Sequence, residues 1–236
     1  MTLVLVHLII AAALFCLCDW LSKIQAGHKP HGRLKKPFLW IAGSTVLFTV
    51  CDYLSRIWGL GGESSWLAFV LILLIAPCAY YCFGRVTRDS GLAIGSSVIN
   101  ASNVITSILV GLVWLLEWRD ISLFQYVGMV FAFLGIVLMC FSGAVDELPV
   151  PQGESATRTI EARFALLFML PLAYFFFGKV TAAEGLALGA GVMNCMNLLF
   201  TLLIGLIALQ EWRRVSLVQY TGMMSAAAGI VLMLFF

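Results

Sequence analysis

The sequence predicts an all-α membrane protein with eight transmembrane helices, built as a four-plus-four inverted repeat. Of its 236 residues, 62% are hydrophobic and only 11% are charged, a composition typical of chains that cross a membrane many times. Apolar runs of about twenty residues, the length that spans a bilayer as a helix, recur along the chain. In addition, the second half of the sequence repeats the first.

The internal repeat relates residues 66–142 to residues 160–236, with a constant offset of 94 and no gap. PCAYYCFGRVT aligns with PLAYFFFGKVT, and EWRDISLFQY aligns with EWRRVSLVQY. Close to half of the aligned residues are identical, against about one in ten for unrelated apolar segments, which identifies a true repeat. Each copy holds three spans. Because three is odd, successive copies enter the membrane from opposite sides, as in many secondary transporters.

Windows of high hydropathy give eight spans. They lie near residues 3–24, 37–58, 66–84, 93–116, 122–142, 162–180, 187–210 and 216–236. The first span has no basic leader and no small-residue cleavage pattern, so we expect a retained helix rather than a signal peptide. The first two spans also resemble each other, since LFCLCDWLSKI and LFTVCDYLSRI share seven of eleven residues. We therefore expect each to be the lead helix of one inverted unit.

These relations divide a single transmembrane domain, residues 1–236, into two units. Unit A is residues 37–142, with spans 2 to 5. Unit B combines the lead helix, residues 1–26, with spans 6 to 8 in residues 160–236. Residues 143–159 contain proline, glycine and serine and are predicted to be a cytoplasmic linker between the units.

The distribution of lysine and arginine predicts the orientation, because basic loop residues stay preferentially in the cytoplasm. With both termini outside, only Arg56, Arg119 and Lys179 of the fourteen basic residues face out, so eleven lie on the cytoplasmic side. We expect an integral protein of the plasma (inner) membrane with both termini outside.

Spans 4 and 7 each carry two asparagines three residues apart, a spacing that puts both on one helix face. They are Asn100, Asn103, Asn194 and Asn197. An amide in hydrocarbon needs a partner, so these faces point inward. They either join helices to each other or line a central solute-binding cavity, to which Tyr80 and Tyr174 are expected to add aromatic faces.

Matched residues also suggest moving parts. Pro77 and Pro171 lie in mid-span, where each frees a backbone carbonyl and predicts either a hinge or a static bend.

The acids well inside apolar runs are Asp19 and Asp52, each followed four residues later by a base, Lys23 and Arg56. A charge in the bilayer core is expensive unless it is paired or hydrated. These residues are expected either to form structural ion pairs within each helix or to gate and couple transport, with one acid–base pair at each mouth.

The fourth span ends at Glu117, which we expect to order the turn and to pair with a neighbouring arginine rather than to bind cargo. Ser122 and Gln125 then predict a capping box that starts span 5. Spans 5 and 8 share small residues, among them Gly128 and Gly222, and have almost no polar residues. They are interpreted as packing or dimerisation helices, which leaves a homodimer through these spans open.

Enzyme chemistry finds no support in the sequence. The three histidines have no metal-binding spacing, and nucleophile elbows, Walker loops and dinucleotide fingerprints are lacking. We expect no catalytic residue, no metal and no cofactor. The partners expected are a small-molecule solute and membrane lipids, and nucleic acid is not implied, because lipid headgroups explain the basic loop between the first two spans.

Residues 117–139, and their copy at 211–233, resemble the end of an EamA-type repeat of the drug/metabolite transporter superfamily. The resemblance is carried by Glu117, by the pair Gln125 and Gly128, and by the later Gly135. With the rest of both three-span copies it covers about two thirds of the chain. The helix count differs from the five per half of that pattern and is similar to an antiparallel pair of small multidrug resistance protomers, in which a lead-helix acid binds cargo and protons.

The sequence thus predicts a secondary transporter that moves a small polar or amphipathic organic solute by alternating access. Two alternatives stay open on the same scaffold. One is a membrane subunit that does not transport, and the other is a flippase for a lipid-linked substrate.

Overall fold

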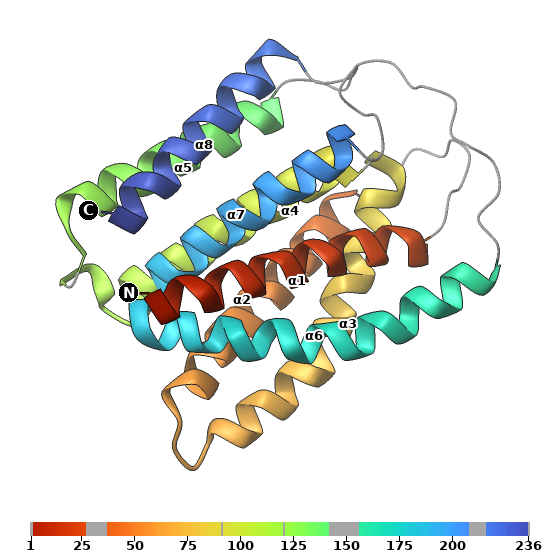
Figure 1. Ribbon diagram of the computed structural model, residues 1–236, viewed down its shortest axis with the longest axis horizontal. Coiled ribbons are helices and arrows are strands. Elements are labelled where there is room, and N and C mark those ends of the chain that lie inside the picture. Colours follow the sequence, from red (N-terminus) through yellow and green to blue (C-terminus); the bar gives the residue numbers. More distant parts are fainter. Residues whose placement is uncertain are drawn as a thin grey trace.

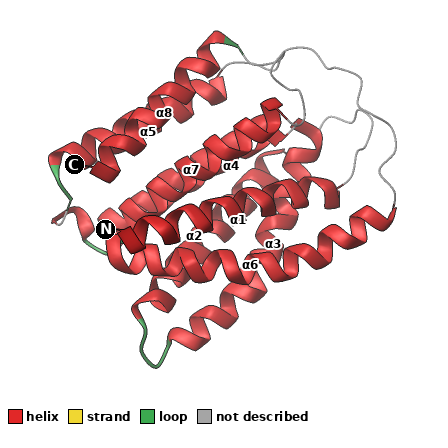
Figure 2. Ribbon diagram, in the orientation of Figure 1, coloured by secondary structure: helices red, strands yellow, loops and turns green. Residues whose placement is uncertain are grey.

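The chain forms eight α-helices, which Figures 1 and 2 show in a computed structural model that describes residues 2–26, 37–90, 92–119, 121–141, 156–207 and 216–235. The helices are α1 (Thr2–Ala26), α2 (Pro37–Leu60), α3 (Ser65–Ser90), α4 (Leu92–Leu109), α5 (Leu123–Phe141), α6 (Ala156–Glu184), α7 (Leu186–Ile207) and α8 (Leu217–Phe235). A π-helical turn (Val110–Trp114) and a short 3-10 helix (Glu117–Arg119) follow α4. In these ranges the chain contains no strand, and the eight helices correspond to the eight expected spans.

Four helices, α1, α2, α3 and α6, are long and apolar enough to cross a membrane. The other four contain shorter apolar segments of 10–17 residues. Large apolar side chains such as Leu3, Trp66 and Leu217 are more than two-thirds exposed, and lipid is the solvent in which such a surface is stable. The protein is accordingly an integral membrane protein.

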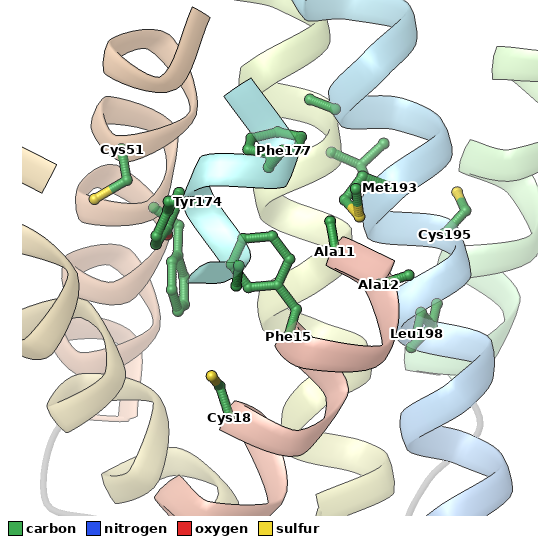
Figure 3. Close-up of a cluster of buried hydrophobic side chains, with 14 of the residues drawn as sticks. Ala11, Ala12, Phe15, Cys18, Cys51, Tyr174, Phe177, Met193, Cys195 and Leu198 are labelled. Carbon is green, nitrogen blue, oxygen red and sulfur yellow. The ribbon is translucent and has the colours of Figure 1, made fainter. Parts of the chain in front are cut away.

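Each lead helix packs on the first span of a different repeat. The most extensive contacts of α1 are with α6, and those of α2 are with α3. Since α6 is the sequence copy of α3, the two lead helices occupy equivalent places. Buried aromatic rings fill both interfaces, and Figure 3 shows Phe15 of α1 between Tyr174 and Phe177 of α6.

Equivalent helices of the two repeats lie beside each other and run antiparallel. Ser96 near the start of α4 contacts Thr201 near the end of α7, with 2.9 Å between the hydroxyl oxygens. Gly111, in the turn after α4, approaches Ala187 at the start of α7. The start of α4 therefore contacts the end of α7, and the turn after α4 contacts the start of α7, as expected for antiparallel helices.

Helices α5 and α8 form a pair beside the other six helices (Figure 1). A Cβ atom built on Gly128 would lie 2.8 Å from the carbonyl oxygen of Gly229, and one on Gly229 would lie 2.6 Å from the nitrogen of Ala132. The Ser225 hydroxyl donates to the Phe131 carbonyl at 2.8 Å. Small residues of these spans thus bring α5 and α8 of the same chain into backbone contact.

The predicted capping box at the start of α5 is confirmed. The Ser122 N–H donates to Gln125 Oε1 at 2.9 Å, and the Gln125 N–H donates to Ser122 Oγ at 3.2 Å. These bonds satisfy two backbone donors that a helix start leaves unpaired.

Helices α3 and α6 continue through Pro77 and Pro171, so the hinge and the static bend both remain predictions for these positions. One sequence expectation needs adjustment. Helix α6 begins at Ala156, so the last four residues of the expected linker are helical, because neither proline nor glycine interrupts them. The remainder of the linker lies outside the described residues.

Candidate functional site

A small cavity of about 20 Å³ lies among α1, α2, α3, α4, α6 and α7. All twelve lining residues are less than a tenth exposed, so the cavity is buried inside the helix bundle. They are Phe15, Asp19, Phe48, Asp52, Tyr80, Asn100, Asn103, Tyr174, Phe177, Met193, Asn194 and Asn197.

The structure brings together all six residues that the sequence suggested for solute binding. The four asparagines reach the cavity from α4 and α7, and Tyr80 and Tyr174 reach it from α3 and α6. Asp19 of α1 and Asp52 of α2 line the same space. Pro77 and Pro171 do not line it, but each lies three residues before one of the tyrosines on the same helix. A bend at either proline would move a lining ring.

Each buried acid is held by the matched asparagine of one repeat. Asp52 Oδ2 accepts a hydrogen bond from Asn103 Nδ2 at 3.0 Å and another from the Ser107 hydroxyl at 2.8 Å. Asp19 Oδ2 accepts a hydrogen bond from Asn197 Nδ2 at 2.9 Å. Because Asn103 and Asn197 hold the same place in the two repeats, the two halves of the site are built alike.

The aromatic wall of the cavity repeats in the same way. Phe48 and Tyr80 meet edge to face with ring centroids 4.9 Å apart and an interplanar angle of 86°. Phe15 and Tyr174 meet at 4.9 Å and 80°. Edge-to-face pairs are a favoured aromatic arrangement and hold the rings in place. The cavity therefore has rigid aromatic sides around a polar centre.

Sequence reasoning missed the apolar half of this lining. Phe15, Phe48, Phe177 and Met193 were not predicted because apolar side chains look alike in a sequence whether they face lipid or a cavity. A signal was available for two of them. Phe15 and Phe48 lie four residues before Asp19 and Asp52, and therefore on the same face of each lead helix.

The predicted ion pair between Asp52 and Arg56 is wrong. Asp52 lines the cavity, whereas the Arg56 guanidinium makes an ion pair with Glu117 at 3.0 Å and donates to the Thr181 carbonyl at 2.6 Å. The long arginine side chain extends toward the end of α2, where this carboxylate and carbonyl lie. Asp19 also lines the cavity, so the expectation of one acid at each mouth is wrong as well.

Lys23, the counterpart of Arg56, is partly buried near the end of α1. The two bases therefore hold equivalent places on the two lead helices, each one turn beyond the acid that lines the cavity.

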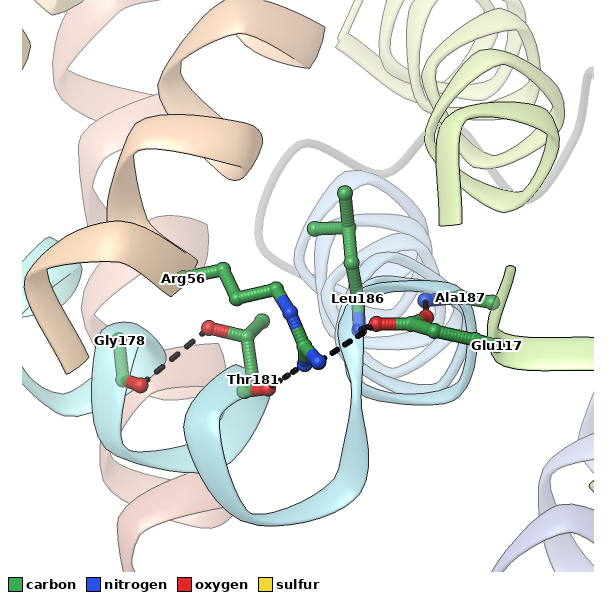
Figure 4. Close-up of polar contacts among 6 residues, drawn as sticks. All are labelled: Arg56, Glu117, Gly178, Thr181, Leu186 and Ala187. Atoms are coloured by element: carbon green, nitrogen blue, oxygen red, sulfur yellow. Dashed lines mark hydrogen bonds and ion pairs between the residues drawn. The ribbon is translucent and has the colours of Figure 1, made fainter. Parts of the chain in front are cut away.

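Glu117 holds the start of α7, as Figure 4 shows. Its two carboxylate oxygens accept hydrogen bonds from the backbone N–H groups of Leu186 at 2.8 Å and Ala187 at 2.7 Å. A carboxylate is favoured there because the first N–H groups of a helix are unpaired and carry partial positive charge. The arginine that pairs with Glu117 is Arg56 of α2, which is far from Glu117 in the sequence, whereas a neighbouring arginine was expected. We call Arg56, Glu117 and Thr181, with the start of α7, the latch.

The backbone after α4 is shaped to deliver Glu117 to this position. The helix widens into a π-helical turn at Val110–Trp114, and Leu116 has a positive φ of 57°, a conformation that costs energy for a residue with a side chain. A Cβ on Gly111 would lie 2.7 Å from Glu117 Oε2 and 2.5 Å from the Ala187 nitrogen. Only glycine fits there.

In the described ranges no group of three or more histidine, cysteine, aspartate or glutamate residues is placed to hold a metal ion. No protein-family model, curated protein or solved structure matches this chain.

Proposed function

We propose that the protein is a secondary transporter that moves a small polar or amphipathic organic solute across the plasma (inner) membrane by alternating access. The observation that carries this proposal is the buried cavity, whose polar and aromatic lining comes from matched residues of both repeats. Polar groups inside a membrane are expensive and generally serve function. Because the cavity has room for little more than a water-sized molecule, we assign this structure to a contracted state from which the helices must separate to admit a solute.

An inverted arrangement of the two units supports alternating access. The antiparallel contacts between α4 and α7, and the packing of each lead helix on a different repeat, fit two four-helix units of opposite orientation. Inverted units can exchange conformations, so that a cavity open to one side in one state opens to the other side in the next. The distribution of basic residues then puts both termini outside.

The latch supplies a closing contact for one side. It joins the end of α2, the turn after α4, the end of α6 and the start of α7. In the proposed orientation these ends face outside, so breaking the latch would open the cavity outward. The matching residues for the other side are Lys23 and Glu211, the second of which lies outside the described residues.

The resemblance to EamA-type repeats is consistent with transport, and we propose membership of the drug/metabolite transporter superfamily on that basis. The two other functions, a non-transporting subunit and a flippase for a lipid-linked substrate, are outcomes of the same test.

The test is uptake of a radiolabelled solute panel, covering amines, amino acids, sugars and nucleosides, into liposomes containing the purified protein. We expect at least one solute to accumulate above protein-free liposomes. Asp19→Asn and Asn103→Ala should reduce that uptake about tenfold, because the first removes a carboxyl group from the cavity and the second removes the hydrogen bond to Asp52. Ser225→Ala, on α8 away from the cavity, is the control.

Uptake of no solute, combined with a stoichiometric partner that co-purifies in mild detergent, would replace transport by the subunit function. Movement of a fluorescent lipid between leaflets without solute uptake would favour the flippase.

A further inference from the structure

Two polar atoms in the cavity lack a hydrogen-bond partner. They are Nδ2 of Asn194 and Oδ1 of Asn197, although these residues are only 8% and 4% exposed. Buried amide groups are nearly always paired, and leaving one unpaired is costly. Both residues lie on α7 and line the cavity.

The corresponding amides of the first repeat are satisfied within the protein. Asn100 Nδ2 donates to the Ser96 hydroxyl at 3.0 Å. Asn103 Oδ1 accepts from the Thr49 hydroxyl at 3.1 Å. Ser96 and Thr49 therefore provide partners for these atoms of Asn100 and Asn103 within the protein.

Two sequence differences between the repeats remove the corresponding hydrogen-bond partners from the other half of the cavity. The counterpart of Ser96 is Ala190, and the counterpart of Thr49 in the first lead helix is Cys16. Alanine has no hydroxyl, and a thiol is only a weak donor, so Asn194 and Asn197 lose the partners that their copies have. Both unpaired atoms thus have the same origin.

The orientation of the Asn197 amide follows from its neighbour. Its Nδ2 donates to the Asp19 carboxyl, and exchanging the amide oxygen and nitrogen would set two acceptors against each other. The oxygen is therefore the atom of this amide that is left unpaired. Asn194 also interacts with the Asp52 carboxyl, although its Nδ2 does not meet the geometry of a full hydrogen bond.

We infer that the polar end of the solute binds on the α7 side of the cavity, at Asp19, Asn194 and Asn197, and that it is a primary amine with a neighbouring hydroxyl group. This inference rests on the proposed function and names the solute class for its site. Asp19 and Asn197 Oδ1 both accept hydrogen bonds, so they fit the N–H groups of an amine. A hydroxyl oxygen accepts from Asn194 Nδ2 and its proton faces Asp52.

The charged and aromatic residues that line the cavity are consistent with an amine as the solute. The lining contains two aspartates and no lysine, arginine or histidine, and Arg56 is engaged with Glu117 outside it. The rings of Phe15 and Tyr174 are packed edge to face in the cavity wall, and aromatic faces attract cations. A compact ammonium group would thus contact both the aspartates and the aromatic rings of the cavity.

The probe for a binding test is 2-amino-1-phenylethanol, with three analogues that each remove one feature. Phenethylamine lacks the hydroxyl, 1-phenyl-1,2-ethanediol replaces the amine by a neutral hydroxyl, and the N,N,N-trimethyl derivative keeps the charge but has no N–H group. Affinities are measured calorimetrically on the full-length protein in detergent. We expect the amino alcohol to bind best, with each analogue about tenfold weaker or more, because each leaves a cavity group unpaired.

Two variants restore the missing partners and so test the asymmetry directly. Cys16→Thr supplies a donor for Asn197, and Ala190→Ser supplies an acceptor for Asn194. Each should weaken binding of the amino alcohol about fivefold to tenfold, because the protein then satisfies the group that the solute would use. The controls make the same substitutions away from the cavity, Cys78→Thr on α3 and Ala228→Ser on α8, and should keep wild-type affinity.

The outcomes separate this inference from the proposed function. Weaker binding in both restoring variants, with intact thermal stability and unchanged controls, supports the inference. Equal affinity for the diol and the amino alcohol, or unchanged affinity in both restoring variants, overturns it, while uptake of other solutes would leave transport standing. Absence of binding by every probe also overturns the inference, and absence of uptake across the whole solute panel overturns transport as well.

Discussion

The Arg56 guanidinium lies 3.0 Å from the Glu117 carboxylate, although Asp52 stands one turn earlier on the same helix. This choice of partner separates two functions that the sequence places side by side. Asp52 keeps its hydrogen bonds to Asn103 and Ser107 in the cavity, while Arg56 joins α2 to the segment that begins α7. Under the proposed function, the acid would be available to a solute and the base would close one end of the cavity.

Removal of the Glu117 carboxylate should destabilise the fold. Glu117→Ala loses an ion pair and two hydrogen bonds to the start of α7, for an expected cost of about 2–4 kcal/mol in the free energy of unfolding. Glu117→Gln keeps one acceptor oxygen for a backbone N–H and should lose about half as much. Thermal unfolding in detergent, followed by intrinsic fluorescence, measures both.

Arg56→Lys is the matched variant for this comparison, since the first lead helix carries Lys23 in the same place. It keeps the charge and should cost less than Glu117→Ala. Equal stability of wild type and Glu117→Ala would show that the latch contributes nothing to the fold.

Breaking the latch should also expose the cavity to one side. In a background with the native cysteines replaced by alanine, Met193→Cys places a thiol in the cavity wall, where the native side chain is 1% exposed. A membrane-impermeant thiol reagent added outside should label it slowly, and about tenfold faster when Glu117→Gln is added, because the outward-open state gains population. Labelling rates are read by mass spectrometry in intact cells.

Faster labelling only from the cytoplasmic side would place the latch on the opposite face of the membrane. Equal rates with and without Glu117→Gln would mean that the latch does not control access. Ser225→Ala, which leaves the latch and the cavity intact, serves as the control for non-specific loosening.

The contact between α5 and α8 predicts a strong size dependence at Gly128. Its nearest neighbours include backbone atoms of Gly229, which cannot move aside as a flexible side chain would. Gly128→Ala should therefore destabilise by about 1–3 kcal/mol, and Gly128→Leu by more. Gly43→Ala is the control, because its new Cβ would meet only the Cys82 sulfur at 3.7 Å, and helix propensity should make it neutral or slightly stabilising. Similar losses at both positions would contradict the close approach.

Hydropathy was sufficient to place the eight helices because a helix that crosses a bilayer must be apolar over its whole length. The polar cavity residues were also predictable, since an amide or carboxyl in an apolar helix must face the interior, and Asp52 and Asn103 do so. The partner of Arg56 was not predictable. The helical spacing made Asp52 the obvious choice, whereas Glu117 comes within reach only when α2, the turn after α4 and α7 pack together.

The difference in hydrogen bonding between the two halves of the cavity was likewise not predictable from the sequence. The repeat shows identical asparagines at matched positions, and identity suggests equal roles. The two halves differ in the residues that neighbour the asparagines, with Ser96 in place of Ala190 and Thr49 in place of Cys16. This difference becomes visible only when hydrogen-bond partners are assigned. Sequence repeats therefore predict shared architecture more reliably than shared chemistry.

The inverted arrangement makes a prediction about Trp118 and Trp212, which follow the fourth and seventh spans at matched positions of the two repeats. Single cysteines at these positions, in the cysteine-replaced background, should be labelled from opposite sides of the membrane. Trp118→Cys should react with an impermeant maleimide in intact cells, and Trp212→Cys should react only after the cells are opened. The excess of basic residues on the Trp212 side sets this direction.

Trp66→Cys is the reference for outside labelling, because it begins α3 next to the short turn after α2, which the same orientation places outside. Labelling of Trp118→Cys and Trp212→Cys from one side would mean parallel repeats. Parallel repeats would make α4 and α7 run in the same direction, which contradicts their antiparallel packing, marked by the Ser96 and Thr201 hydroxyls 2.9 Å apart. Parallel repeats would also require a further segment that crosses the membrane between the two three-span copies.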